Sequence, residues 1–209
     1  ALLAVTGLDT FARRAVELLA LEVALAGNRL KALPDTLAAC QQLASWATSP
    51  IYNGLSVAVN VSARQFQHTD FVQHVIDALQ RTGANPALLK LELTESMLID
   101  NLQVVIKKMS ALKAHGVRFA LDDFGTGYSS LSYLKQLPLD ELKIDRSFVQ
   151  DIFSDPNDAA IARMVIVLAD TLGLTVIAEG VENAEQQALL LGQGCQQFQG
   201  FLFSRPLQI

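Results

Sequence analysis

Cysteine is scarce in this sequence, which has only Cys40 and Cys195 among its 209 residues. Two cysteines so far apart exclude a disulfide framework and a cysteine-based zinc site. Each is therefore expected to be a buried, small apolar residue in a reducing compartment, and we expect a cytoplasmic location. The histidines are also few, and they form no metal-ligand pattern, so we expect them at the surface: His68, His74 and His115.

Positive charge is in short supply as well. Lysine and arginine number 16 against 21 acidic residues, giving a net charge of −5. This sign disfavours duplex nucleic acid as a partner. If the protein acts on phosphates, a metal ion must supply the missing positive charge.

Long apolar runs are absent. The run at 164–169 is far too short to span a membrane, and the N-terminus lacks the basic start and apolar stretch of a signal peptide. We therefore expect no direct membrane insertion by this domain. Apolar residues still make up 51% of the chain and charged residues only 18%, which excludes wholesale disorder and favours sheet strands buried on both faces.

Short runs rich in β-branched residues alternate with amphipathic segments. Predicted strands are 56–61, 89–94, 117–122, 141–145, 174–179 and 196–203, and residues 1–5 could be the stump of another. Predicted helices are 70–82, 100–115, 157–172 and 182–191, with two more at 10–26 and 35–47 before the first full strand.

This alternation indicates a parallel α/β sheet, and we predict a modified TIM-like βα barrel that forms a single domain over residues 1–209. A doubly wound sheet is the rival, but no glycine-rich phosphate turn follows the first strand. A full barrel takes about 250 residues, so the chain is short by about one strand, and we expect the N-terminal strand to be missing.

Polar residues stand where the predicted strands end, and each strand is otherwise expected to be apolar. They are Asn60, Glu92, Asp122 with Asp123, Lys143 with Asp145, Glu179 and Gln199. In a parallel barrel these strand ends meet at one mouth, where barrel enzymes keep their active sites. Converging carboxylates repel one another unless a cation joins them, and ligands that are all oxygen favour Mg²⁺ or Mn²⁺.

Asp122 and Asp123 are neighbours, and neighbours in a regular strand face opposite sides. Both can face the mouth only if the strand ends there, as Gly125 suggests. Two adjacent carboxylates could then hold two metals, as in phosphodiester hydrolysis. The alternative is a turn whose Asp caps a helix near 129–134.

Other polar residues near these strands also have more than one interpretation. Lys143 could orient a water, act as a Schiff-base amine, or form a structural salt bridge with Glu92 or Asp122. Glu95 could hold the following glycine-rich loop, or simply cap a helix. Arg64 could contact a phosphate, or be plainly exposed.

Six stretches together resemble the EAL domain of bacterial cyclic di-GMP phosphodiesterases. They are VNVSARQF (59–66), LELTES (91–96), ALDDFGTGYSSLSYL (120–134), LKIDRSF (142–148), VIAEGVE (176–182) and QGFLFSRP (199–206). The resemblance implies a modified βα barrel that hydrolyses cyclic di-GMP to linear pGpG with Mg²⁺ or Mn²⁺, with two ions per active site.

The resemblance also implies individual roles. Asn60, Glu92, Asp122, Asp123 and Glu179 would be metal ligands. Lys143 would position or deprotonate the attacking water, Glu179 would share in catalysis, and Glu95 would anchor the loop 124–134. The substrate or metal pocket would be lined by Gln199, Asp145, Glu182 and Pro206, with Arg64 as a further substrate contact.

The N-terminus departs from the family pattern. Ala1-Leu2-Leu3 resembles the naming Glu-Ala-Leu triplet without its metal-binding Glu, and Ala4 replaces the usual substrate-binding Arg. These departures leave open a receptor or scaffold that binds cyclic di-GMP without turnover. An unrelated Schiff-base aldolase that uses Lys143 would leave the acidic ring unexplained. The resemblance further suggests a homodimer and a larger parent protein, which could be membrane-tethered, with other domains.

Overall fold

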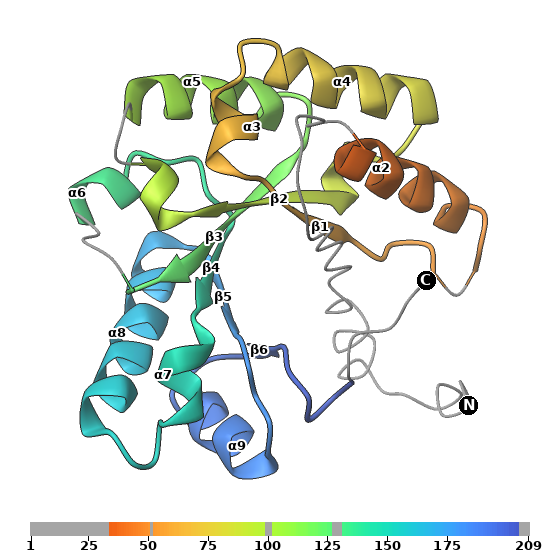
Figure 1. Cartoon of the computed structure of the whole chain (residues 1–209). Helices are drawn as coiled ribbons and strands as arrows, with labels where there is room; N and C mark the ends of the chain where they lie inside the picture. Colours follow the sequence, from red (N-terminus) through yellow and green to blue (C-terminus); the bar gives the residue numbers. More distant parts are fainter. Residues whose placement is uncertain (1–33, 51, 99–101, 127–130, 205–209) are drawn as a thin grey trace.

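The computed structural model describes residues 34–50, 52–98, 102–126 and 131–204. Within them a curled parallel sheet has the strand order β1-β2-β3-β4-β5-β6, so each strand lies beside the next one in sequence (Figure 1). A doubly wound sheet would reverse this order part-way. The α/β barrel prediction is therefore confirmed, in the form of a half-barrel.

The strands alternate with helices along the chain. The strands are β1 (Val57–Asn60), β2 (Leu89–Thr94), β3 (Arg118–Phe124), β4 (Glu141–Ile144), β5 (Thr175–Ala178) and β6 (Gln197–Phe198). The α-helices are α2 (Pro34–Trp46), α3 (Ala63–Gln67), α4 (Phe71–Thr82), α5 (Leu102–Lys113), α6 (Leu131–Leu134), α7 (Arg146–Gln150), α8 (Pro156–Leu172) and α9 (Ala184–Gly192). Two 3₁₀ turns, η1 (Pro86–Leu88) and η2 (Glu95–Leu98), flank β2.

The longest of these helices, α8, shows how local sequence sets the helix ends. The Asp155 side chain accepts a hydrogen bond from the Asn157 backbone N–H, and Pro156 begins the helix, where its missing N–H costs nothing. Gly173 ends the helix in the left-handed conformation, with φ at 69°. The predicted range 157–172 therefore agrees with the structure to within one residue.

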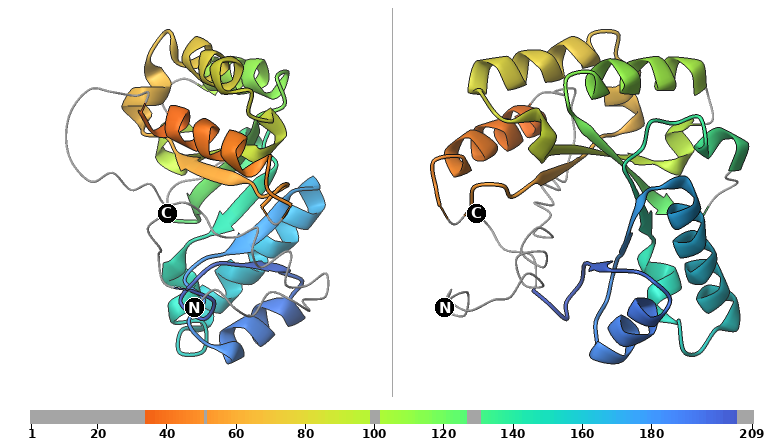
Figure 2. Two further views of the ribbon diagram at one scale, coloured as in Figure 1. Left: turned by 90° about the vertical axis from the view of Figure 1, so that its right-hand side faces the viewer. Right: turned by 180° about the vertical axis from the view of Figure 1, so that it is seen from behind.

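The hydrophobic core lies between the sheet and its surrounding helices. Helices α2, α4 and α5 cover one half of the curled sheet and α8 and α9 the other (Figures 1 and 2). The outward side chains of β2 and β3 are fully buried beneath them: Leu89, Leu91, Leu93, Phe119 and Leu121. Cys40 and Cys195 are free and buried, as predicted.

The inner face of the sheet carries charged residues near the starts of β2, β3 and β4 as well as near their ends, so the prediction of strands that are apolar except at their C-terminal ends is wrong. Lys90, Arg118 and Glu141 stand near the starts of β2, β3 and β4. Alternation explains this, because residues two apart share a face and these three are in step with Glu92, Asp122 and Lys143. Strand β4 is nevertheless buried on this face as well, since Glu141 is only 4% exposed and Lys143 only 3%.

Some predicted elements differ from the structure. β6 occupies only part of the predicted strand 196–203, and the short helices α3 and α7 were not predicted. His74 is half-buried, unlike the exposed His68 and His115. The possible stump at 1–5 and the predicted helix at 10–26 lie outside the described residues. Among the helices that are described, none is both long and apolar enough to cross a membrane.

Candidate active site

Lys143 stands at the centre of the polar inner face. Its ammonium nitrogen lies 2.9 Å from Glu92 Oε2, 3.3 Å from Asp122 Oδ1 and 2.5 Å from Glu179 Oε1. These three carboxylates come from the neighbouring strands β2 and β3 and from the residue that follows β5. The lysine side chain is only 4% exposed, so the cluster is buried rather than a surface network. The structural salt bridge is therefore present, and it leaves the catalytic interpretation of Lys143 open.

The electrostatics show an excess of negative charge around this lysine. Burial lowers the pKa of Lys143, but the charges of Glu92, Glu179 and Asp122 outweigh burial and raise it well above its ordinary value. Burial raises the pKa of Glu179 to about 7 despite the attraction of Lys143. Burial likewise raises the pKa of Glu92. By formal charge, the three carboxylates exceed the one ammonium that they surround.

Asp122 and Asp123 reach the same region through an irregularity in the backbone of β3 that the sequence did not predict. The strand does not end at Asp122, since β3 continues to Phe124. Instead the β3–β4 register shifts between Leu121 and Phe124, and Asp123 adopts a positive φ of 55°. Such a bulge with a left-handed residue re-aims a side chain. Burial, followed by the charges of Asp122 and Asp145, raises the pKa of Asp123, so its carboxyl lies within this acidic cluster.

Asp145 and Glu95 both make local contacts at the mouth. Asp145 Oδ1 accepts a hydrogen bond from the Ser147 backbone N–H at 2.9 Å and thereby caps α7. Glu95 Oε2 accepts one from the Gly125 N–H at 3.3 Å, at the start of the loop that it is predicted to anchor. The other oxygen, Glu95 Oε1, is buried and has no hydrogen-bond partner within the described part of the chain.

The remaining predicted residues lie outside the ion pairs that Lys143 makes. Asn60, at the end of β1, is the Cα partner of Glu92. Gln199 extends the β5–β6 pairing, because its N–H donates to the Ala178 carbonyl at 2.8 Å. Glu182 is exposed and lies 3.6 Å from Arg146. Arg64 lies exposed on α3, the short helix that follows β1. Pro206 lies outside the described residues.

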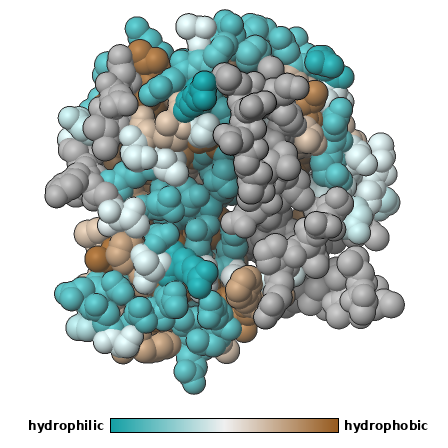
Figure 3. Space-filling model, in the orientation of Figure 1, coloured by the Kyte–Doolittle hydropathy of each residue, from teal (hydrophilic) through white to brown (hydrophobic). Residues whose placement is uncertain are grey.

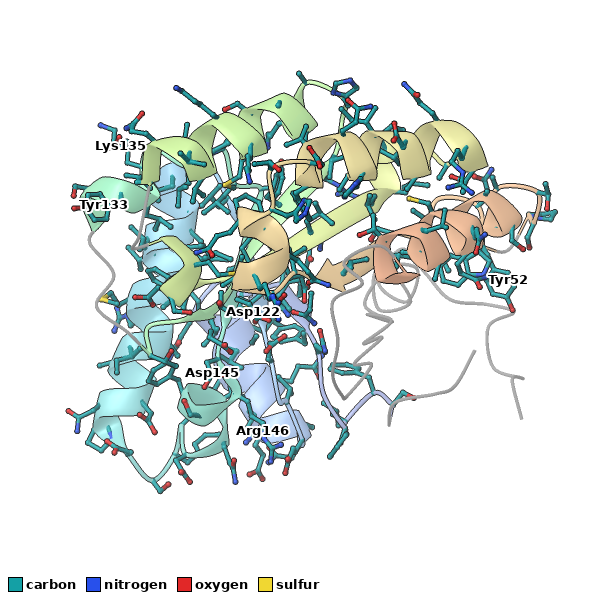
Figure 4. The ribbon with its side chains drawn as sticks, turned by 45° about the horizontal axis from the view of Figure 1, so that its top comes forward. Tyr52, Asp122, Tyr133, Lys135, Asp145 and Arg146 are labelled. Atoms are coloured by element: carbon teal, nitrogen blue, oxygen red, sulfur yellow. The ribbon has the colours of Figure 1, made fainter. Side chains whose placement is uncertain are left out.

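The surface over this cluster is hydrophilic. Figure 3 shows hydrophilic residues across the middle of one face, between α3 above and α7 below. Asp122 and Asp145 lie near the centre of Figure 4, and Arg146 lies beside them. Tyr52, Tyr133 and Lys135 stand at the periphery in the same view.

The donor set suits a hard divalent cation. Carboxylate oxygens and the Asn60 amide are the ligands that Mg²⁺ and Mn²⁺ prefer, and neither thiol nor imidazole lies among the predicted ligands. In residues 34–50, 52–98, 102–126 and 131–204, no three acidic, histidine or cysteine side chains already converge in metal-binding geometry. Lys143 holds three of the carboxylates instead. The formal charge of these three carboxylates exceeds that of the one ammonium they contact, and a divalent ion would balance it.

Sequence reasoning missed a second group of charges on the same face. Lys90 Nζ lies 2.6 Å from Glu141 Oε2, and their side chains are only 12% and 5% exposed. The signal was available, because charged residues alternate with apolar ones in LKLEL (89–93) and ELKI (141–144).

Comparison with known proteins identifies the family to which this fold belongs. The family model of the EAL domain matches residues 36–206. The chain belongs to the EAL domain family. The EAL match includes every described strand and the whole cluster around Lys143. It begins after Ala1–Ala4, so the departures noted there lie outside both the match and the described residues.

Two curated EAL relatives come from Pseudomonas aeruginosa. The bifunctional diguanylate cyclase/cyclic di-GMP phosphodiesterase MucR is 44% identical over 81% of this chain and 24% of its own length. The cyclic di-GMP phosphodiesterase NbdA is 44% identical over 82% of this chain and 22% of its own length. The chain thus spans about a quarter of the length of these relatives, which are much larger proteins.

Solved structures agree with the EAL assignment. The PaMucR phosphodiesterase in its c-di-GMP complex has a TM-score of 0.79 and 44% identity, and the match covers 82% of this chain and 69% of that one. Klebsiella pneumoniae BlrP1, in a manganese/cy-diGMP complex, has a TM-score of 0.71 and 35% identity, and the match covers 82% of this chain and 44% of that one.

Proposed function

We propose that this EAL domain hydrolyses cyclic di-GMP to linear pGpG with the help of bound Mg²⁺ or Mn²⁺. The observation that carries the proposal is the ring of Glu92, Asp122 and Glu179 around Lys143, built from separate strands at one end of a parallel half-barrel. Family membership and the c-di-GMP complex of PaMucR support the choice of substrate. The manganese complex of BlrP1 supports the use of a divalent metal.

The metal site would draw on side chains at the ends of three neighbouring strands and on the residue that follows β5. Asn60, Glu92, Asp122 and Glu179 would hold one ion, and Asp123 would complete the site for a second. When bound, such cations polarise phosphoryl oxygens and lower the pKa of a coordinated water. The protein's own part would be to aim these oxygens at one place, which the left-handed backbone of Asp123 assists.

Lys143 would orient the attacking water and steady the charge that develops on the phosphate. In the metal-free protein the surrounding carboxylates raise the pKa of Lys143, which favours orienting over deprotonation. The same argument disfavours a Schiff-base role, which needs a free amine. In the reaction, water adds to phosphorus, one ester oxygen leaves and takes up a proton, and the ring opens to the linear dinucleotide.

Glu95, Gln199, Asp145 and Glu182 would shape the surroundings of the substrate. Glu95 would fix the start of the loop after β3 through the Gly125 N–H. Asp145 is already engaged as the cap of α7, so its contribution would be to place that helix at the mouth. Arg64 and Pro206 remain proposed substrate contacts.

The test is turnover of cyclic di-GMP by the whole chain with Mn²⁺, comparing Glu92→Gln with the matched exposed variant Glu185→Gln on α9. We expect the first to lose activity by at least about a hundredfold, because a neutral amide is a poorer metal ligand. Glu185→Gln should retain the parent rate. Undiminished turnover by Glu92→Gln would refute the assignment, and binding without turnover by the parent would indicate a receptor.

A further inference from the structure

Two buried ion pairs lie one above the other on the inner face of the sheet. Lys90 of β2 pairs with Glu141 of β4 at 2.6 Å, and Glu92 of β2 pairs with Lys143 of β4 at 2.9 Å. The order of charges is reversed between the strands, lysine then glutamate on β2 and glutamate then lysine on β4. Both pairs therefore cross over β3, the strand between them.

Ala120 makes this crossing possible. It is the Cα partner of Glu92 on one side and of Glu141 on the other, so the two glutamates flank it at the same height. Alanine is fully buried here and offers only a methyl group, which leaves room for the two lysine chains. Arg118, the Cα partner of Lys90, places a further cation beside the lower pair.

Lys90 is close enough to Glu92 to compete for it. The two residues are separated by two positions on one strand face, or roughly 6–7 Å along the strand, within the reach of a lysine side chain. The Lys90 charge already counteracts, as a minor influence, the rise in the Glu92 pKa that burial causes. What directs the ammonium elsewhere is Glu141, whose carboxylate has Lys90 as its one hydrogen-bond partner among the described residues.

We propose that Glu141 is a positioning residue that holds the Lys90 ammonium away from Glu92 and so keeps Glu92 available to a divalent cation. This inference rests on the proposed function, since it needs Glu92 to be a metal ligand. It assigns a role in the site to a residue at the start of a strand, since Glu141 lies two residues before Lys143 on the same face of β4. Glu141 does not touch the substrate, and its effect passes through Lys90.

The experiment measures the affinity of the metal-free whole chain for Mn²⁺ alone, from the electron paramagnetic resonance signal of the free ion. Glu141→Gln should weaken Mn²⁺ binding by about tenfold or more, because the released ammonium turns to Glu92 and must be displaced. Lys90→Met should bind Mn²⁺ at least as tightly as the parent. The double variant Lys90→Met/Glu141→Gln should return to within about threefold of the parent, because the competing charge is gone.

Two matched variants control for net charge. Lys113→Met removes a lysine from its partly exposed ion pair with Asp140. Glu185→Gln removes an exposed acid from α9. Neither variant should alter Mn²⁺ affinity. Far-ultraviolet circular dichroism and thermal unfolding establish that each variant is folded. If Glu141→Gln fails to fold, the Mn²⁺ affinities of Lys90→Met and of the double variant test the inference instead. The double variant is expected to fold, because replacement of both members of a buried pair is often tolerated.

The Mn²⁺ affinities of the parent and the variants distinguish failure of this inference from failure of the proposed function. Equal affinity for the parent and Glu141→Gln would overturn the inference and leave the proposed function standing. Weakening by Lys90→Met as large as that by Glu141→Gln would also overturn it, because the pair would then merely hold the strands together. Absence of Mn²⁺ binding by the parent itself would overturn the metal-dependent function and the inference together.

Discussion

Replacement of Lys143 by methionine should destabilise the metal-free protein severely. The substitution keeps most of the side-chain volume but removes the ammonium that contacts Glu92, Asp122 and Glu179. Removing one partner of a buried ion pair costs about 3–5 kcal/mol, because the remaining charges stay buried without compensation. For a chain of this size the loss corresponds to a fall in Tm of about 6–20 °C.

The loss should depend on pH. Without Lys143 the pKa of Glu179, already about 7, rises further, and so does the raised pKa of Glu92. A carboxyl whose pKa is higher in the folded than in the unfolded state favours folding at low pH, and this advantage disappears as pH rises through the folded pKa. Lys143→Met should therefore be closer to the parent in stability near pH 5 than near pH 8.

Urea unfolding with and without Mn²⁺ measures both effects. Mn²⁺ should stabilise Lys143→Met more than the parent, since a divalent cation can replace the lost positive charge among the carboxylates. Lys113→Met is the matched control, because its ion pair with Asp140 is about one-third exposed and is worth only about 0–1 kcal/mol. If Lys143→Met were no less stable than Lys113→Met near pH 8 without metal, the argument from buried charge would be refuted.

Three further outcomes follow from particular residues. In the metal-free protein, burial raises the pKa of Glu179 from 4.5 to about 7, so Glu179→Gln should reduce the loss of stability between about pH 5 and pH 8 in urea titrations; an unchanged slope would contradict this. Burial raises the pKa of Cys195 to about 11, so iodoacetamide should label it in urea but hardly at all in the native protein near pH 8, as mass spectrometry would show; rapid native labelling would speak against it. Gly200→Ala would place a Cβ 2.2 Å from the Val181 carbonyl oxygen and should cost about 2–4 kcal/mol in thermal unfolding, whereas Gly192→Ala meets open space and should be neutral or slightly stabilising; equal effects would refute the steric argument.

The architecture was predictable because its signals are local. Strand patterns such as LKLELT (89–94) and helix boundaries such as Gly173 depend on alternation and backbone conformation within a few residues. The carboxylates after the strands were also visible, and a parallel barrel brings strand ends to one place whatever the details of packing.

The short element β6 and the bulge in β3 were not predictable in the same way. β6 pairs with β5 at only two positions, so its extent depends on its neighbour rather than on its own sequence. Asp123 adopts φ 55° because the β3–β4 register shifts there, and a register belongs to two strands at once.

The sequence by itself determined that the chain forms a curled parallel sheet and that acidic side chains follow its strands. It thereby determined which residues could come close together. Only the tertiary structure decided their partners. Lys143 contacts three carboxylates, and Lys90 pairs with Glu141 across 51 positions of the chain. The physical reason is that charge pairing inside the half-barrel depends on distances of a few ångströms between different strands, and no local pattern in the sequence encodes such distances.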